Sequence, residues 1–216
     1  MLGVLKKDAY TYLLLMLILS AFTGLTLSMD GMDRGAVMLM GTMSLILVLG
    51  ATSISEQNED KMGGYRLLGT LPITVWELVS AKFLLAFVFG ILNLSVGMAL
   101  IHRLAPSSEF LILARFYLWA CTFVGLTLAG LVFVGVFYGG FGKFLRLAMR
   151  TLPAIVVIIP IIVRRFFWED IVAIPISSMV TMADSVHWGI LMIFGTMIYG
   201  CLLLLAVWTK KNYAVA

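Results

Sequence analysis

The residues best placed to do chemistry lie in one polar interval between two long apolar stretches. Glu56, Glu59 and Asp60 bring three carboxylates together at the start of this interval, and Lys61 and Arg66 follow them. Carboxylates so close together could serve the acid–base chemistry of an intramembrane protease, but the two histidines of the chain are both expected in loops far from them. The alternative is charge pairing, either within the interval or with basic groups on a partner protein.

The usual catalytic and nucleotide-binding motifs are missing. The sequence contains no H-E-x-x-H, no C-x-x-C and no P-loop G-x-x-x-x-G-K-[ST]. If ATP drives this protein, another chain must therefore bind it. Cys121 and Cys201 both lie in apolar stretches, so we predict two free thiols and no disulfide.

The end of the polar interval has the pattern of a helix start. Thr74 and Glu77 have the spacing of a capping box, in which each side chain bonds to the backbone N–H of the other residue. Pro72 disfavours a helix immediately before this point. We therefore predict a helix that begins near Val75 and runs without a break through Lys82 into the next apolar stretch.

The middle of the interval predicts a short amphipathic helix over residues 62–68, ended by Gly69. Gly63 and Gly64 weaken its first turn by roughly 1 kcal/mol each relative to alanine. Such a helix needs a surface on which to dock.

The composition indicates that lipid surrounds most of the chain. Of its 216 residues, 62% are hydrophobic and 12% are charged, whereas globular domains are roughly 25% charged. A membrane span needs about 20 apolar residues, so the chain can hold about six spans and little else. We predict an all-α integral membrane protein whose single domain covers residues 1–216. The predicted spans are 9–28, 35–55, 83–101, 116–138, 144–163 and 188–208.

The distribution of basic residues predicts the orientation. Ten Lys and Arg lie on one side of the predicted spans and five on the other, which places both termini in the cytoplasm. The loop 56–82 between the second and third spans is then cytoplasmic. The apolar piece within residues 164–187 is about 13 residues long and contains Pro175. It is too short to cross the membrane, so we expect a re-entrant or interfacial hairpin on the outer side.

The predicted spans lack ionisable residues in their interiors. Proton- and ion-coupled carriers usually place such residues along their pathway, so the chain is not expected to power transport by itself. Asn93, Ser95, Thr122 and Thr127 are polar groups at depth, and we expect them to bond across helices. The small residues of Gly125-x-x-x-Ala129 predict a close helix or subunit interface.

The polar interval resembles the corresponding loop of a known family. Residues 56–82 read E-x-x-E-D-K-x-x-x-Y-R-L-L-x-T-L-P-I-T-x-x-E-L-V-x-A-K, which is similar to the loop between the second and third spans of ABC-2-type transporter permeases. The small six-span subunits of this family, similar to peptide-toxin exporter permeases, are the best match.

The resemblance implies a dimer of permease subunits that works with separate ABC nucleotide-binding subunits. ATP and Mg would be bound by that partner, and this non-catalytic chain would bind no cofactor and no metal. Residues 62–68 would be the coupling helix that docks on the ATPase. The implied ATPase interface is Glu56, Glu59, Asp60, Lys61, Met62, Tyr65, Arg66, Leu67 and Leu68. The helix that continues into the third span would act as a lever, and its cap and first turns would be formed by Pro72, Thr74, Glu77 and Lys82. Residues 1–10, which include Lys6 and Lys7, would be an interface segment.

The expected function is therefore export across the cell membrane of a bacterium, powered by a partner ATPase. A transport pathway lined by spans that are nearly free of charge suits amphipathic peptides or hydrophobic small molecules. Sodium extrusion is a family alternative that the lack of buried carboxylates disfavours. Two other classes remain open, a stand-alone channel or carrier and a non-transporting toxin-immunity membrane protein.

Overall fold

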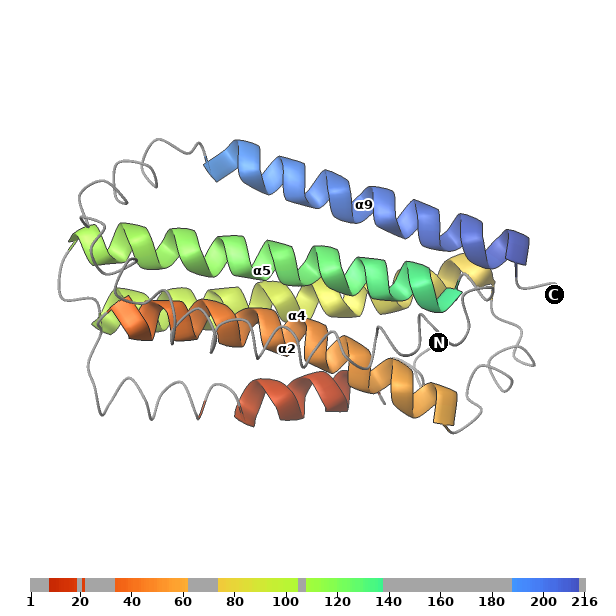
Figure 1. Cartoon of the computed structure of the whole chain (residues 1–216), viewed down its shortest axis with the longest axis horizontal. Coiled ribbons are helices and arrows are strands. Elements are labelled where there is room, and N and C mark those ends of the chain that lie inside the picture. Colours follow the sequence, from red (N-terminus) through yellow and green to blue (C-terminus); the bar gives the residue numbers. More distant parts are fainter. Residues whose placement is uncertain are drawn as a thin grey trace, which may run out of the picture.

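A computed structural model of the chain is all-helical over the residues that it describes (Figure 1). The described residues are 8–18, 21, 34–61, 74–104, 108–137 and 188–213. They form the helix Asp8–Ile18, here called the first helix, and four long helices. The long helices are α2 (Arg34–Lys61), α4 (Val75–Leu104), α5 (Ser108–Phe137) and α9 (Trp188–Tyr213).

The long helices lie side by side along the bundle (Figure 1). α2 and α4 run in opposite directions, so that α2 ends and α4 begins at the same end of the bundle. α5 and α9 also finish there, and the Lys210 ammonium near the end of α9 lies 4.7 Å from the centre of the Phe137 ring. We call this end the Lys82 end. α2 packs most extensively on α5, and α9 packs on α5 and α4.

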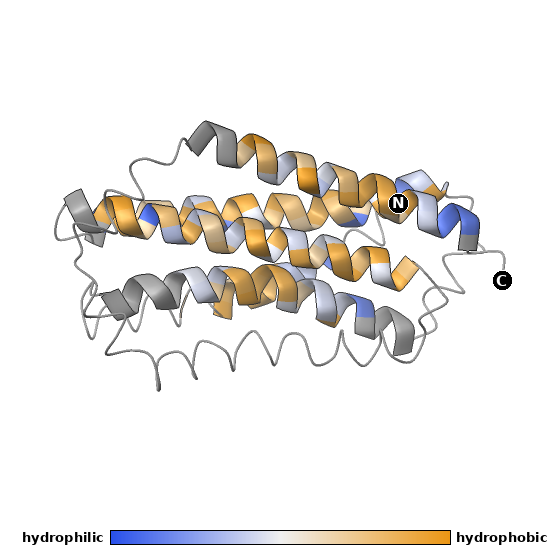
Figure 2. Cartoon of the chain, turned by 45° about the horizontal axis from the view of Figure 1, so that its top comes forward, coloured by the Kyte–Doolittle hydropathy of each residue, from blue (hydrophilic) through white to orange (hydrophobic). Residues whose placement is uncertain are grey.

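Three of these helices are long and apolar enough to cross a membrane, over Val75–Arg103, Leu111–Phe137 and Met192–Asn212. α2 contributes the shorter apolar stretch Gly41–Glu56. Hydropathy colouring shows apolar residues along the middle of the helices and hydrophilic ones mainly toward their ends (Figure 2). The predicted span 144–163 and the outer hairpin 164–187 lie outside the described residues, and the count of six spans stays a prediction.

Two helices extend beyond the spans predicted for them. α2 continues through Glu56 to Lys61, and neither glycine nor proline occurs between Glu56 and Gly63 to end it earlier. The fourth span was expected from residue 116, but α5 begins at Ser108, soon after the helix-breaking Pro106. Arg115, which precedes the predicted span, therefore lies in α5.

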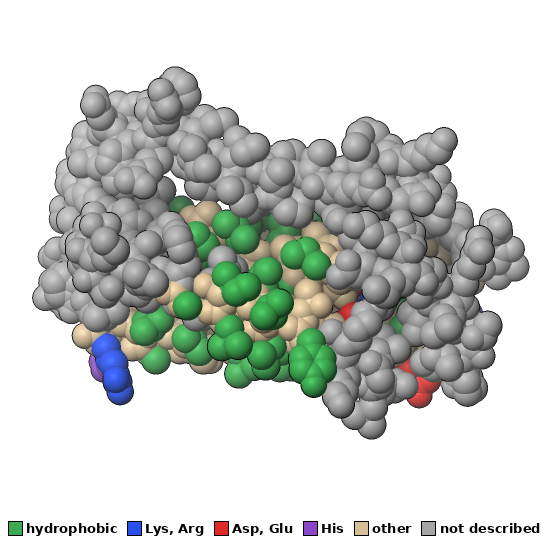
Figure 3. All heavy atoms as spheres, turned by 90° about the horizontal axis from the view of Figure 1, so that it is seen from below, with side chains coloured by type: hydrophobic (Ala, Val, Ile, Leu, Met, Phe, Trp, Pro, Cys, Tyr) green, Lys and Arg blue, Asp and Glu red, His purple; other side chains and the backbone are tan. Residues whose placement is uncertain are grey.

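The larger apolar core cluster lies between the first helix, α2, α4, α5 and α9, and a smaller one lies between α4 and α5. Tyr12 stacks on Phe89 with ring centres 5.2 Å apart, and Phe83 packs on Phe133 at 4.9 Å. Outside this core, α4 exposes an apolar residue every four positions, at Leu84, Val88, Leu92 and Val96. Hydrophobic side chains likewise cover the middle of the described surface seen in Figure 3. Such faces suit a lipid solvent.

The Gly125–Ala129 pair forms a close contact between helices of this chain. A Cβ added at Gly125 would lie 3.3 Å from the Cα atom of Leu45 in α2 and 3.5 Å from its carbonyl oxygen. Ala129 is fully buried in the same cluster. The small residues thus let the backbones of α2 and α5 approach closely, as small-x-x-x-small patterns do in membranes.

Candidate functional site: the Lys82 end of the bundle

The start of α4 carries the hydrogen bonds expected of a capping box. The Thr74 backbone N–H donates to Glu77 Oε2 at 2.9 Å, and the Glu77 N–H donates to Thr74 Oγ1 at 3.2 Å. The Thr74 hydroxyl also donates to Glu77 Oε2 at 2.9 Å. The Leu78 N–H then donates to the Thr74 carbonyl at 3.1 Å, which is the first intrahelical bond. Because the cap satisfies two N–H groups that would otherwise be orphaned, α4 begins at a defined residue.

These contacts also favour the ionised form of Glu77. The bond from the Thr74 backbone N–H, and then the one from the Thr74 hydroxyl, hold the pKa of Glu77 below its ordinary value of 4.5. Because the folded pKa is lower than the unfolded one, the cap contributes fully above the unfolded pKa. That contribution is lost as the pH falls through the folded pKa.

Glu77→Ala is therefore expected to speed hydrogen exchange of the Leu78 amide at neutral pH by roughly fivefold, the effect of losing one cap. The difference between the variant and the unmodified chain should disappear once the pH is below the folded pKa of Glu77. Ser80→Ala is a matched control, because the Ser80 hydroxyl bonds only to the Glu77 carbonyl of its own helix. An equal difference at both pH values would contradict the assignment of the cap to the carboxylate.

A cluster of six buried polar side chains lies one to two turns inside this end of the bundle, and we call it the polar clamp. Its central contact is an ion pair between Glu56 Oε1 on α2 and Lys82 Nζ on α4. The two side chains are only 4% and 2% exposed. Pairing offsets part of the cost of removing both charges from water. The members of the polar clamp are Asp8, Tyr12, Thr52, Ser55, Glu56 and Lys82.

The other contacts of the polar clamp join the first helix to α2. The Ser55 hydroxyl donates to Asp8 Oδ1 at 2.6 Å, one residue before Glu56. One turn deeper, Tyr12 Oη and Thr52 Oγ1 are 2.7 Å apart. Thr52 donates its single proton to the Val48 carbonyl at 2.8 Å, so the tyrosine is the donor to Thr52. These contacts are short, buried and directional, and they tie three helices into one unit.

The polar clamp closes the base of the interval that the sequence analysis singled out. Glu56 and Lys82 are 26 residues apart, and the chain between them leaves α2 and returns at the Thr74 cap. The ion pair thus holds the two ends of this segment against each other. Chemically, the cluster pairs and orients charges. Among the described side chains, no group of three or more His, Cys, Asp or Glu could hold a metal ion.

A second hydrogen-bond chain crosses the middle of the bundle. Asn93 Nδ2 on α4 donates to Ser44 Oγ on α2 at 2.8 Å, and Ser44 Oγ is 2.7 Å from Thr122 Oγ1 on α5. Asn93 and Thr122 therefore bond across helices, as expected from the sequence. Ser95 and Thr127 do not, because their hydroxyls donate to the carbonyls of Ile91 and Phe123 in their own helices.

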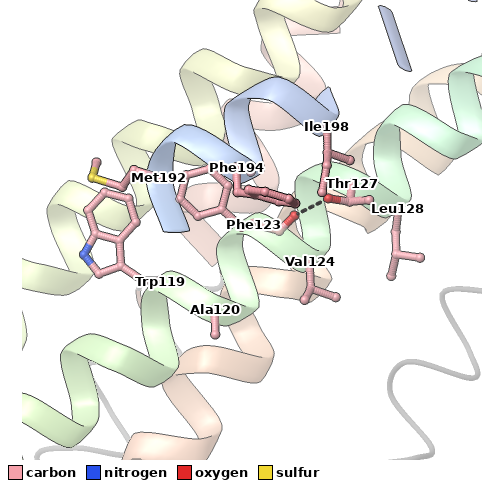
Figure 4. A pocket seen from close by; sticks show the side chains of 10 residues that line it. Trp119, Ala120, Phe123, Val124, Thr127, Leu128, Met192, Phe194 and Ile198 are labelled. Atoms are coloured by element: carbon pink, nitrogen blue, oxygen red, sulfur yellow. Dashed lines mark hydrogen bonds between the residues drawn. The ribbon is translucent and has the colours of Figure 1, made fainter. Parts of the chain in front are cut away.

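An apolar groove of about 330 Å³ lies between α5 and α9 (Figure 4). Trp119, Phe123 and Thr127 line it from α5, and Met192 and Phe194 line it from α9. The Trp119 and Phe123 rings stack with centres 5.5 Å apart. The Thr127 hydroxyl is satisfied by its own helix, so it leaves the lining without an open hydrogen-bonding group there.

The structure describes only part of the expected site. Glu56, Thr74, Glu77 and Lys82 are described in full, and the first and last of these four meet in the polar clamp. Glu59, Asp60 and Lys61 lie in the last turn of α2, but their side chains are outside the described part. Also outside it are Lys6, Lys7, Met62, Tyr65, Arg66, Leu67, Leu68 and Pro72.

Sequence reasoning missed the partners that the first helix supplies. Asp8 and Tyr12 are four residues apart, as are Thr52 and Glu56, so each pair lies on one helix face. Polar residues repeated at this spacing near the ends of two apolar segments were the available signal. The signal does not say which two faces meet.

Comparison with known proteins decides the family. A model of the family described as ABC-2 family transporter protein matches residues 3–214. The chain belongs to the ABC-2 transporter family. Searches of curated proteins and of solved structures each returned no match. Membership supports a membrane protein, and the apolar helices agree with it.

Membership in the ABC-2 family indicates the kind of partner expected at the segment between α2 and α4. Subunits of this family are permeases of ABC exporters, typically non-catalytic and paired with an ABC ATPase. The resemblance that the residues 56–82 carried is thereby confirmed at the level of the family. The polar clamp and the Thr74 cap lie at the two ends of the segment where such a partner was expected to dock.

Proposed function

We propose that this chain is the membrane-spanning subunit of an ATP-driven exporter, and that its partner ATPase docks on residues 62–68. The observation that carries the proposal is the polar clamp. A docking segment transmits force only if its two ends are anchored, and the Glu56–Lys82 ion pair anchors them in α2 and α4. Family membership supplies the class of partner.

The lever in this proposal is α4. It begins at the Thr74 cap and continues without a break to Leu104, 30 residues later. At 1.5 Å per residue such a helix is about 45 Å long, enough to cross a bilayer. When ATP binding brings the ATPase subunits together, the docked segment moves and α4 tilts as one body. The first helix follows because Asp8 and Tyr12 tie it to α2.

The rest of the assembly follows from this role. ATP and Mg lie on the partner subunit, and two copies of this chain, or this chain and a paralogue, form the membrane core. The termini and the docking segment face the cytoplasm of a bacterial cell, as the distribution of Lys and Arg predicts. The cargo is an amphipathic peptide or a hydrophobic small molecule, which suits the apolar faces that α4, α5 and α9 present.

The test removes the docking side chains. The double variant Tyr65→Ala, Leu68→Ala is expected to lose co-purification of the ABC ATPase and the stimulation of its ATP hydrolysis. The membrane fold should remain, because both residues lie in the segment between α2 and α4. Thermal unfolding in detergent checks the fold.

Leu84→Ala is the matched control, since it removes an equally apolar side chain that is 60% exposed on α4 outside the docking segment. It should leave ATPase recruitment unchanged. Full recruitment and stimulation by the double variant would reject residues 62–68 as the docking segment. Uphill transport by the purified chain alone, without nucleotide, would reject the ATP-driven function.

A further inference from the structure

Tyr199 is a buried residue on a helix that is otherwise largely exposed. Its side chain is 7% exposed, whereas Ile193, Phe194 and Met197 on α9 are each more than 60% exposed, at 62%, 64% and 64%. The Tyr199 hydroxyl donates to the Phe83 carbonyl of α4 at 2.8 Å. Its ring packs on those of Phe83 and Phe87, with centres 5.1 Å and 5.8 Å away.

The Tyr199 hydroxyl bonds to another helix, whereas two threonine hydroxyls of α9 bond within their own helix. The hydroxyls of Thr196 and Thr209 donate to the carbonyls of Met192 and Ala206 within α9 itself. A buried phenol without a partner would be costly, and a carbonyl oxygen has a second lone pair beyond the one used in its helix. The Phe83 carbonyl can therefore accept from Tyr199 while α4 stays intact.

The acceptor lies next to the polar clamp. Phe83 directly follows Lys82, so consecutive residues of α4 are tied to α2 by the ion pair and to α9 by Tyr199. Within one turn a helix moves as a rigid body, so a displacement that reaches Lys82 also reaches the Phe83 carbonyl. We infer that Tyr199 is a positioning residue that makes α9 follow α4, and this inference rests on the proposed function.

The contacts that α9 makes with α5 at Gly130 and Gly195 are of a different kind. Beside the groove, Leu202 packs on Gly130, and Phe123 packs on Gly195, so these two contacts are apolar and rely on glycine. Nearer the end of α9, the Lys210 ammonium lies over the Phe137 ring of α5. The Tyr199 hydroxyl supplies a directional contact to α4. When α4 tilts, α9 is displaced relative to α5, and the groove in Figure 4 changes its width.

The experiment uses the full chain with the ABC ATPase that co-purifies with it. Spin labels are placed at Val124 on α5 and Met197 on α9, which are 49% and 64% exposed, after both native cysteines are replaced. The distance between the labels is measured with and without a non-hydrolysable ATP analogue. The unmodified tyrosine should give a nucleotide-dependent shift, and Tyr199→Phe should lose most of it while ATPase recruitment is unchanged.

Two further variants separate the hydroxyl from general packing. Thr196→Val removes a hydroxyl that bonds within α9 and should keep the full shift. Phe87→Leu removes a ring neighbour of Tyr199 and should also keep it, because the hydroxyl bond to Phe83 remains.

Each outcome is decisive. A full shift in Tyr199→Phe overturns the inference and leaves the proposed function standing. Loss of the fold in Tyr199→Phe, measured by thermal unfolding, also overturns it, because Tyr199 would then serve stability alone. A chain with native Tyr199 that recruits no ATPase overturns the proposed function and this inference with it.

Discussion

Lys82→Met is expected to lower the free energy of unfolding by about 3–5 kcal/mol, the cost of leaving one charge of a buried ion pair without its partner. Glu56 is 4% exposed, so its carboxylate cannot regain water without opening the contact between α2 and α4. Glu56→Leu should also destabilise the chain, because it removes the carboxylate that pairs with the buried Lys82 ammonium.

The double variant Glu56→Leu, Lys82→Met should recover most of this loss. Replacing both charges with apolar groups of similar volume removes the desolvation cost together with the attraction, and such exchanges are often close to neutral. Urea or thermal unfolding of the four proteins in the same detergent gives the coupling energy of the pair. Additive losses in the double variant would show that the two side chains do not depend on each other.

The same double variant separates stability from function. If the ion pair anchors the docking segment, the stable double variant should still recruit the ATPase but pass less of its motion to the membrane helices. The nucleotide-dependent shift between labels on α5 and α9 should therefore shrink. A stable double variant with the full shift would assign the ion pair to folding alone.

Gly125→Leu is also expected to lower the stability of the chain strongly, because it forces apart the backbones of α2 and α5. The first atom of a new side chain would meet the Cα and carbonyl oxygen of Leu45, at 3.3 Å and 3.5 Å, and backbone atoms cannot rotate away as a side chain can. Overpacking of this kind typically costs about 1–3 kcal/mol and can cost more.

Gly200→Leu on α9 is the matched control. A Cβ at Gly200 meets nothing within 4 Å, so the same substitution adds a side chain into open space. It should leave stability unchanged or raise it slightly, because glycine is a poor helix former. Thermal unfolding and the yield of folded protein in detergent compare the two variants. Equal stability of both would show that the close approach of α2 and α5 at Gly125 does not limit the fold.

The local features of this chain could be predicted from its sequence. The Thr74–Glu77 cap and the start of α4 at Val75 depend on residues a few positions apart. Such short-range hydrogen bonds follow largely from spacing and residue type. The full lengths of α2 and α5 do not follow from hydropathy alone, because polar residues can extend a helix past the end of its apolar part.

The hydrogen-bond partners of the buried polar groups could not be predicted from the sequence. Asp8 finds Ser55 at a separation of 47 residues, and Tyr199 finds Phe83 at a separation of 116. Spacing within one helix shows which residues share a face, but the choice of facing helix depends on how all the helices pack. Family resemblance pointed to the segment between Glu56 and Lys82, yet it said nothing of the ion pair that joins those two residues.

By itself, then, the amino-acid sequence predicted the long helices that the structure describes, the membrane character of the chain and the place of its polar segment. These properties follow from hydropathy and short-range hydrogen bonding, which act along the chain. Only the tertiary structure decided that Glu56 turns inward to Lys82 and that α9 is bonded to α4 beside that ion pair. Buried charges and hydroxyls must be satisfied by whichever groups packing brings near, so their partners are properties of the whole bundle.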